Sequence, residues 1–216
     1  MPYLGNQHIV GDSVRNFKVL DDISSHTATF DGSSASVVST SDNTIRIINH
    51  RFVQGQRVVY SNGGGGNING LTANAYYIIK DSPHTFKLAA NESDAASLTP
   101  INLTSVGTGS SHTLRVSFDG VNKKFKATHS SGNKTHIHHA TQLSVSINNV
   151  PQRPNDNLTF TEGFAVENKS IIVFKQAPIP TDIFFGSAFG ETLGTFDISD
   201  LAIDNYVGDG LSLIHI

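Results

Sequence analysis

The chain has 216 residues, a formal net charge of −3 and only 15% charged residues, while Ser, Thr and Asn together supply 60 residues. This composition predicts a surface of hydroxyl and amide groups, and it disfavours a protein that binds nucleic acid through a clustered basic excess. The absence of cysteine excludes disulfides, thiolate catalysis and cysteine-based zinc sites, and no apolar run approaches the roughly 20 residues of a membrane-spanning helix.

Short segments rich in β-branched and aromatic residues, separated by Gly, Asn, Asp, Ser and Pro, predict β-strands along most of the chain. These segments are residues 43–48, 56–60, 75–79, 85–89, 112–118, 142–147, 170–174 and 182–185. In the segment 142–147, Leu143, Val145 and Ile147 alternate with polar residues, as in a strand with one buried face. The Asn148–Asn149 pair that follows predicts a hairpin turn, because Asn tolerates a positive φ better than other non-glycine residues.

Helical signal is confined to residues 91–98, which predict one or two turns capped by Asn91 or Ser93. The remaining pattern is that of strands and turns. We therefore predict an all-β fold of small antiparallel β-sandwich modules in series, with one module inserted into another.

Two stretches of small residues interrupt the strand pattern. The glycine tract at residues 62–67 predicts a mobile surface loop, and residues 105–111 have the composition of a domain boundary. The tripeptide Phe-Asp-Gly occurs at residues 30–32 and again at 118–120, which suggests a host strand interrupted by an insertion. The expected division is 1–40 as an N-terminal segment with the first strands of a host sandwich, 41–115 as an inserted or tandem small β-module, 116–196 as a β-sandwich module, and 197–216 as a linker into a further module.

Two parts of the chain carry recognisable motifs of turn and core residues. The first runs from Asn43-Thr-Ile-Arg-Ile through Thr85-Phe-Lys-Leu-Ala to Gly107-Thr-Gly, and the second is Leu143-x-Val-Ser-Ile-Asn-Asn-Val-x-Gln-x-Pro followed by residues 171–174. The first resembles a small β-module that recurs in tail proteins of marine bacteriophages and in some large bacterial surface proteins. The second resembles the repeated β-sandwich of cyanophage-like tail fibre and baseplate proteins.

The resemblance implies a non-enzymatic structural component of a phage tail, located in the virion and acting in assembly and host attachment. The expected partners are further copies of the chain in a homotrimer, other tail or baseplate proteins, and a host surface glycan, with neither nucleic acid nor membrane insertion. Two alternatives remain open: a carbohydrate-binding or adhesin module of a bacterial surface protein, and the non-catalytic stem of a tail-spike depolymerase. Residues 211–216 do not continue the pattern and resemble translated sequencing-adapter sequence, which predicts a fragment of a longer protein; a genuine C-terminal strand is the alternative.

The chain offers one candidate metal site and one candidate interface. His136 and His138 are two residues apart and therefore share one face of a strand. Similar pairs from three chains of trimeric phage fibres enclose one octahedral metal ion, so the pair predicts a metal at a trimer axis, with an exposed polar loop as the alternative. No other cofactor is expected. Phe184, Phe185 and Phe189 are more large rings than a small sheet needs for its own core, and they are the candidate interface residues.

The carboxylates predict no catalytic site. Glycan hydrolysis needs two carboxyl groups about 5–9 Å apart, one of them with a raised pKa. The candidates all occur in turn contexts, where Asp accepts hydrogen bonds from nearby backbone amides: Asp21, Asp22, Asp119, Glu162, Asp182 and Asp197. No Gly-x-Ser-x-Gly elbow is present either, so we expect no catalytic residues and no enzymatic activity.

Overall fold

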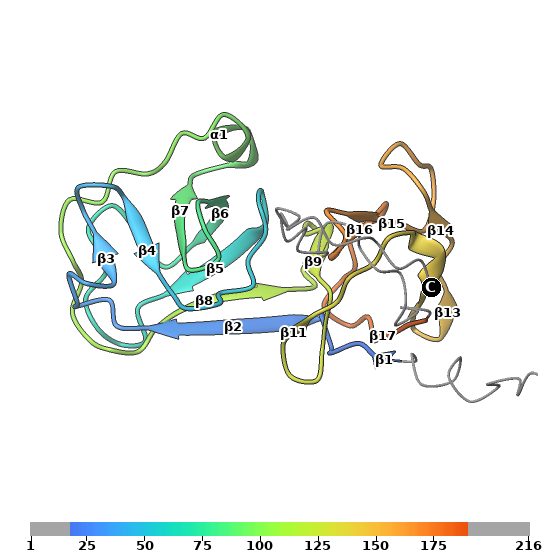
Figure 1. Cartoon of the computed structure of the whole chain (residues 1–216). Coiled ribbons are helices and arrows are strands. Elements are labelled where there is room, and N and C mark those ends of the chain that lie inside the picture. The colour runs from blue at the N-terminus through green and yellow to red at the C-terminus, as the bar shows by residue number, and fades with distance from the viewer. Residues whose placement is uncertain (1–17, 190–216) are drawn as a thin grey trace, which may run out of the picture.

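The computed structural model describes residues 18–189, and this part of the chain is almost entirely β-structure, as predicted. Figure 1 shows two lobes joined lengthwise. One lobe is formed by residues 25–117 and is called here the inserted module. The other is formed by residues 18–23 and 119–189 and is called the host module. The single α-helix of the described residues has five residues, and none of the described helices is long and apolar enough to cross a membrane.

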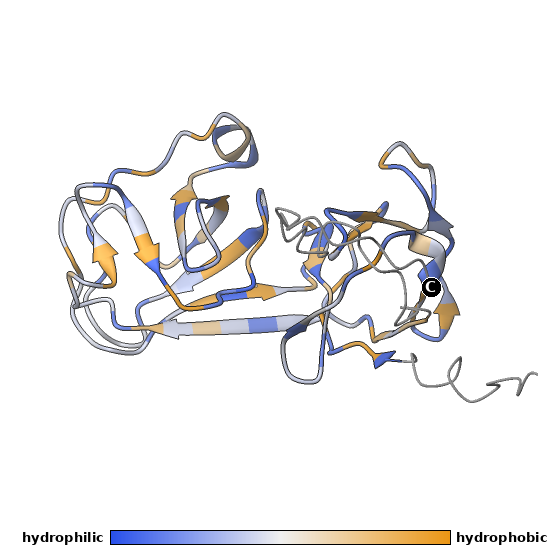
Figure 2. Ribbon diagram, in the orientation of Figure 1, coloured by the Kyte–Doolittle hydropathy of each residue, from blue (hydrophilic) through white to orange (hydrophobic). Residues whose placement is uncertain are grey.

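The inserted module is one seven-stranded antiparallel sheet in the order β2-β8-β5-β6-β7-β4-β3. Its strands are β2 (Ser25–Phe30), β3 (Val38–Ser39), β4 (Thr44–Arg46), β5 (Arg57–Ser61), β6 (Ala75–Lys80), β7 (Thr85–Ala89) and β8 (His112–Ser117). The strands alternate buried and exposed residues, because successive side chains point to opposite faces of a sheet. Figure 2 shows the resulting mixture of apolar and polar residues along these strands.

The host module contains two four-stranded sheets and one short hairpin. The first sheet has the order β1-β17-β12-β13, the second has the order β14-β15-β16-β9, and β10 pairs with β11. The strands are β1 (Lys18–Val19), β9 (Lys124–Lys126), β10 (Thr128–His129), β11 (Asn133–Lys134), β12 (Leu143–Ile147), β13 (Val150–Pro151), β14 (Pro154–Asn155), β15 (Phe164–Glu167), β16 (Ile171–Phe174) and β17 (Phe184–Ala188). All neighbours are antiparallel except β14 and β15, which are parallel. A 3₁₀ turn, η1 (Ala140–Gln142), precedes β12.

The chain enters and leaves the inserted module at adjacent points. β1 pairs with β17, the last strand of the described residues. The next strand, β2, runs beside β8, with Ser25 opposite Ser117 (Figure 1). Phe118 N–H donates a hydrogen bond of 2.8 Å to the carbonyl oxygen of Ser24. The excursion therefore begins after Ser24 and ends before Phe118. The predicted division at residue 40 differs from this arrangement, because β2 and β3 lie in the seven-stranded sheet and not in the host module.

The local predictions agree with the structure where a short stretch decides its own conformation. Asn148 and Asn149 have φ values of 52° and 63° and join β12 to β13 in the predicted hairpin. The helix α1 (Glu92–Ala96) has Asn91 as its N-cap, whose side chain accepts a hydrogen bond from the N–H of Asp94. Each of the eight predicted strand segments overlaps a strand, although β17 begins at Phe184 and runs past the predicted segment 182–185 to Ala188.

The glycine tract differs from the mobile loop that we predicted. Gly66 and Thr108 exchange two backbone hydrogen bonds of 3.1 and 3.0 Å, and a Cβ on Gly65 would lie only 1.8 Å from the Thr108 carbonyl oxygen. The tract therefore lies in close contact with residues 105–111, within the inserted module. The two backbones can touch because the tract is made of glycines, whereas a side chain at these positions would keep them apart. Residues 105–111 are thus an internal loop of this module and not a boundary between domains.

The two Phe-Asp-Gly tripeptides have parallel roles at the ends of β2 and β8. Phe30 and Phe118 are buried, while the carboxylates one residue later accept hydrogen bonds from backbone N–H groups just downstream. Asp31 accepts from Ser33 in this way, and Asp119 accepts from Val121 and Asn122. The repeat thus marks a strand end followed by an Asp-stabilised turn.

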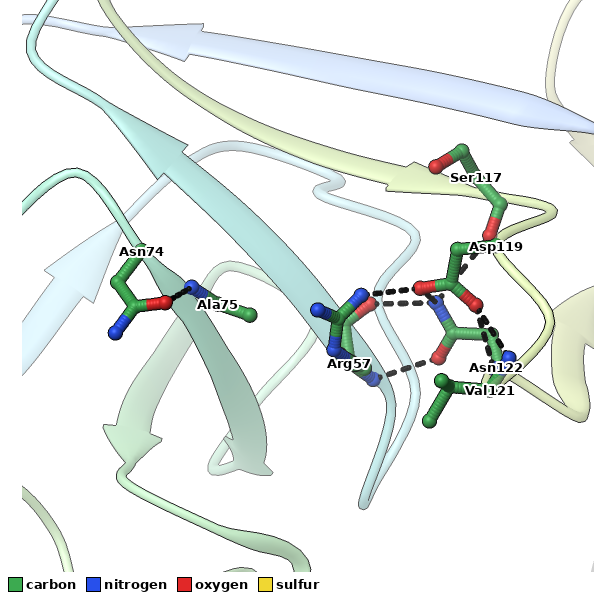
Figure 3. A network of polar contacts seen from close by, with 7 residues as sticks. All are labelled: Arg57, Asn74, Ala75, Ser117, Asp119, Val121 and Asn122. Atoms are coloured by element: carbon green, nitrogen blue, oxygen red, sulfur yellow. Dashed lines mark hydrogen bonds and ion pairs between the residues drawn. The ribbon is translucent and has the colours of Figure 1, made fainter. Parts of the chain in front are cut away.

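Side chains bridge the two modules beside the exit point. The Asn122 side chain accepts a 2.8 Å hydrogen bond from the Arg57 N–H and donates one of 2.9 Å to the Arg57 carbonyl oxygen (Figure 3). The Arg57 guanidinium forms an ion pair with Asp119, drawn in the same view. The Phe118 ring, one residue before Asp119, packs edge-to-face on Phe125, with ring centroids 4.9 Å apart. A single hydrophobic core thus continues from one module into the other.

Candidate functional site: the cleft between the modules

The predicted metal ligands lie at the surface of the host module. His136 and His138 are exposed and flank Ile137, which is only 1% exposed, so both imidazoles lie on the outer side as expected. This stretch is not part of a strand. Within residues 18–189, no group of three or more His, Cys, Asp or Glu side chains is placed to hold a metal ion. A metal site at this pair therefore needs ligands beyond those of residues 18–189, and the trimer hypothesis takes them from further chains.

The three predicted interface phenylalanines separate into two classes. Phe184 is only 9% exposed and belongs to the core, whereas Phe185 is 53% exposed and Phe189 is 47% exposed. The reason is the alternation of side chains along β17, which directs consecutive residues to opposite faces. Phe185 lies opposite Ser146 in the register, and Val19, on the neighbouring strand β1, is also half exposed. Phe185 and Phe189 remain candidates for an interface, and Phe184 does not.

The carboxylates that we considered for catalysis have structural partners. Asp22 accepts hydrogen bonds from Ser24, and Asp182 accepts from the N–H of Ile179. Glu162 forms an exposed ion pair with Arg153. Together with Asp119 and its turn, these contacts agree with the predicted turn contexts, while Asp197 lies outside the described residues.

A cleft that the sequence did not predict lies between the two modules, with a volume of about 690 Å³. One wall comes from the inserted module, through the loop of residues 48–52 together with Lys80 and Pro83. The other wall comes from the host module, through the segment from Lys126 to His136 and the turn before β16. This volume lies within the range of small-molecule sites in proteins. The cleft is therefore the candidate functional site.

Arg51 crosses from one wall of the cleft to the other. Its Nη2 donates a 2.8 Å hydrogen bond to the Ser131 carbonyl oxygen, 80 residues later in the sequence. Arg51 has a φ of 61°, a conformation that is uncommon for a residue with a side chain. A Cβ on Gly132, which has a φ of 113°, would lie 1.8 Å from the same guanidinium nitrogen. The glycine at position 132 is thus required for the guanidinium to approach this loop.

Asp21 binds the loop that contains Ser131, the hydrogen-bond partner of Arg51. The Asp21 carboxylate accepts hydrogen bonds from the N–H groups of Ser131 and Gly132, at 3.0 and 2.8 Å, and from the Thr128 hydroxyl at 2.7 Å. Desolvation works to raise the pKa of Asp21, but these hydrogen bonds and the charge of Arg51 together hold it below its usual value. Asp21 is therefore ionised at neutral pH, and it fixes the host wall of the cleft.

A buried histidine, His50, and a half-buried histidine, His26, support the wall on the side of the inserted module. The Phe52 N–H donates to Nδ1 of His50 at 3.0 Å, so the imidazole proton lies on Nε2, which donates to the Ser82 carbonyl oxygen at 3.0 Å. The His50 ring stacks on Phe52 with centroids 5.4 Å apart. The second histidine, His26, donates a hydrogen bond of 3.2 Å from Nε2 to the His50 carbonyl oxygen. Burial lowers the pKa of both imidazoles, which keeps them neutral at pH 7.

Comparison with known proteins finds no matching family model, no matching curated protein and no matching solved structure. The sequence did not indicate the cleft because Arg51 and Lys126 lie in segments 75 residues apart, and nothing in either segment shows that the two meet. The signal that was present is the polar run Asn49-His50-Arg51, which interrupts the strand pattern between β4 and β5.

Proposed function

We propose that this chain is a non-enzymatic structural subunit of a phage tail, as a fibre, baseplate or adaptor component, that contributes to virion assembly and host attachment. The observation that carries the proposal is the double connection between the modules. The chain crosses the junction twice, at Ser24 and Phe118, and the two crossings are bonded to each other. The Asn122 amide and the Arg57–Asp119 ion pair add side-chain bridges at the same place.

A junction of this kind resists bending. Two modules joined by one flexible linker move independently, whereas a continuous core and paired crossings hold them in one orientation. A stiff series of β-modules is what a spacing or force-transmitting element of a tail requires. The resemblance of both modules to phage tail modules supports the same function.

We further propose that copies of the chain associate, as a homotrimer, through the face of the host module that carries Phe185. Phe185 and Val19 are half-exposed apolar side chains on the sheet of β1, β17 and β12, and the half-exposed Phe189 follows the end of β17. Val19 lies opposite Ser187, two residues from Phe185, so Val19 and Phe185 share one face of the sheet, and contiguous apolar patches on a surface mark interaction sites. Trimeric symmetry is the expectation taken from the resemblance, and the oligomeric state in solution tests it.

The experiment that tests the tail function is localisation. An antibody raised against the purified chain should label the tails of phage particles whose genomes encode this reading frame, as seen by immuno-electron microscopy. Peptides of the chain should also be recovered by mass spectrometry from gradient-purified particles. Recovery of the chain in the envelope of uninfected bacteria, without any in particles, would overturn the proposal and favour the bacterial adhesin alternative.

A further inference from the structure

The strand β2 is the longest edge strand of the three larger sheets that the structure describes. The strand order places β2 and β3 at the edges of the seven-stranded sheet, β1 and β13 at the edges of one host sheet, and β9 and β14 at the edges of the other. β2 has six residues, whereas each of the other edge strands has two or three. A strand at a sheet edge presents backbone N–H and C=O groups with which another polypeptide can pair.

The other edge strands carry features that discourage such pairing, and β2 does not. β13 and β14 each contain a proline, β9 has a lysine at each end, and β1 and β3 have only two residues. β2 reads Ser-His-Thr-Ala-Thr-Phe, without proline, Asp, Glu, Lys or Arg, and it pairs with β8 residue by residue, without a bulge. Its two threonines also favour an extended backbone. β2 is therefore an unprotected edge.

The register shows which backbone groups of β2 point away from β8. The Phe118 N–H donates to the carbonyl oxygen of Ser24, which lies opposite it. In the continuous ladder that follows, every second residue of β2 therefore exchanges hydrogen bonds with β8, namely His26, Ala28 and Phe30. The N–H and C=O groups of the residues between them point to the free edge: Ser25, Thr27 and Thr29. These three residues are exposed, and no other residue within 18–189 forms a hydrogen bond with their backbone groups.

An extended segment fits this edge better than a second rigid copy of the chain does. The hairpin β10–β11 lies close to the start of β2, because the Asp21 N–H donates to the Thr128 carbonyl oxygen, and in Figure 1 the hairpin extends beyond β2 on the side away from β8. A second copy that paired its own β2 would have to bring a whole module up against this hairpin. A single added strand needs a width of only about 5 Å.

We propose that β2 receives an added β-strand from another polypeptide, an extended segment of alternating Thr, Ser or Val residues without proline at the positions that face β2. Backbone hydrogen bonds to Ser25, Thr27 and Thr29 provide most of the affinity. The hydroxyl side chains of the same residues pair with Thr, Ser or Val across the new ladder. This surface belongs to the inserted module and is separate from the Phe185 face of the host module, so the inference goes beyond the association proposed above and does not depend on it.

Amide hydrogen exchange measured by NMR on the full chain tests the proposal. In the free chain, the amides of Thr27 and Thr29 should exchange faster than those of Ala28 and Phe30, which are bonded to β8. The probe is a short soluble peptide that alternates threonine and valine. At millimolar concentration it should slow the exchange of Thr27 and Thr29 by about tenfold or more. The same peptide with every amide N-methylated should have no effect, because it has no backbone N–H to donate.

Several results would overturn the proposal. Slow exchange of Thr27 and Thr29 in the dilute free chain would mean that the chain covers this edge itself. Protection that rises with the concentration of the chain would mean that a second copy occupies the edge. Equal protection by the N-methylated peptide, or no protection by either peptide, would exclude strand addition.

Matched proline variants locate the binding. Thr27→Pro removes one N–H at the free edge but no hydrogen bond to β8, and it should weaken binding of the peptide by about tenfold or more. Thr161→Pro, at an exposed threonine in a loop of the host module, should leave the affinity within about twofold, as should Thr27→Val, which keeps the N–H. Circular dichroism verifies the fold of each variant, and the N-methylated peptide tests the same hydrogen bonds on the unaltered chain.

Equal effects of Thr27→Pro and Thr161→Pro would overturn the assignment to β2. Phe185→Asp, which alters the face proposed for association, should leave binding of the peptide unchanged. The two proposals therefore fail separately, since loss of association says nothing about β2, and absence of peptide binding says nothing about Phe185.

Discussion

The hydroxyl of Tyr60 lies 2.8 Å from Nδ1 of His112, and both residues are almost fully buried. The His112 Nε2 is within 3.0 Å of the Thr108 carbonyl oxygen and must donate to it, so Nδ1 is an acceptor and Tyr60 is the donor. The same hydroxyl accepts a hydrogen bond from the Ile68 N–H. Burial raises the pKa of Tyr60, which keeps the hydroxyl protonated. This pair thus joins the strands β5 and β8 to Ile68, which follows the glycine tract, and to Thr108, in the loop that contacts the tract.

Removing the Tyr60 hydroxyl should destabilise the protein. Tyr60→Phe leaves His112 Nδ1 and the Ile68 N–H buried without partners, which should lower the free energy of unfolding by about 1–3 kcal/mol. Urea denaturation followed by circular dichroism measures the change. Tyr77→Phe is the matched control, because Tyr77 is only partly buried, and equal losses in the two variants would contradict the role assigned to the Tyr60 hydroxyl.

Gly32 should tolerate no side chain. A Cβ at position 32 would lie 2.3 Å from Nδ1 of the buried His112, so Gly32→Ala should cost about 3 kcal/mol, at the upper end for overpacking. Gly55→Ala is the control, since its Cβ would meet nothing within 4 Å and it should cost only the strain of a φ of 74°, about 1–2 kcal/mol. Urea midpoints of the two variants test the difference, and a smaller loss for Gly32→Ala would refute the steric argument.

The junction between the modules should depend on the Asn122 amide. Asn122→Ala removes the partners of both Arg57 backbone groups, and we expect a loss of about 2 kcal/mol in unfolding free energy. Asn74→Ala, which removes an exposed amide bonded only to the next residue, should change stability by less than about 0.5 kcal/mol. Limited proteolysis near residue 120 should accelerate in Asn122→Ala alone; unchanged cleavage and stability would mean that the core holds the junction without this amide.

Stability should fall as the pH is lowered through the range of histidine titration. The folded chain holds His26 and His50 with lowered pKa values, while the unfolded chain titrates near the usual value of 6.5. The unfolded state therefore binds more protons below pH 6.5, and folding stability is complete above that pH and lost as the pH falls toward the folded pKa values. Urea midpoints from pH 7.5 to 5 should show this loss. The slope should be reduced in His50→Gln and retained in His136→Gln, a surface control; an equal slope in all three would exclude His50 as a cause.

Association should require the exposed ring of β17. Phe185→Asp should abolish oligomers that the unaltered chain forms at micromolar concentration, because an unpaired charge buried in an interface costs several kcal/mol. Light scattering coupled to size-exclusion chromatography gives the mass. Leu158→Asp, which alters an equally exposed apolar residue elsewhere in the host module, should leave the mass unchanged. Loss of association in both variants would argue for a general effect of added charge.

Local sequence determined much of this protein. The alternation from Leu143 to Ile147, the Asn148–Asn149 turn and the Asn91-capped helix all follow from interactions between residues close together in the chain. These features depend on backbone preferences and on which side chains are apolar, and both can be judged from a few neighbouring residues. The all-β class followed from the same patterns.

The tertiary structure decided which strands became neighbours and where charges met. β2 pairs with β8 across more than 80 residues of sequence, and nothing within either strand identifies the other, because both expose similar alternating faces. The contact between Arg51 and Ser131 and the packing of the glycine tract arise in the same way. Each depends on the register and twist of whole sheets, which fix the distance between segments only after long-range pairing is complete.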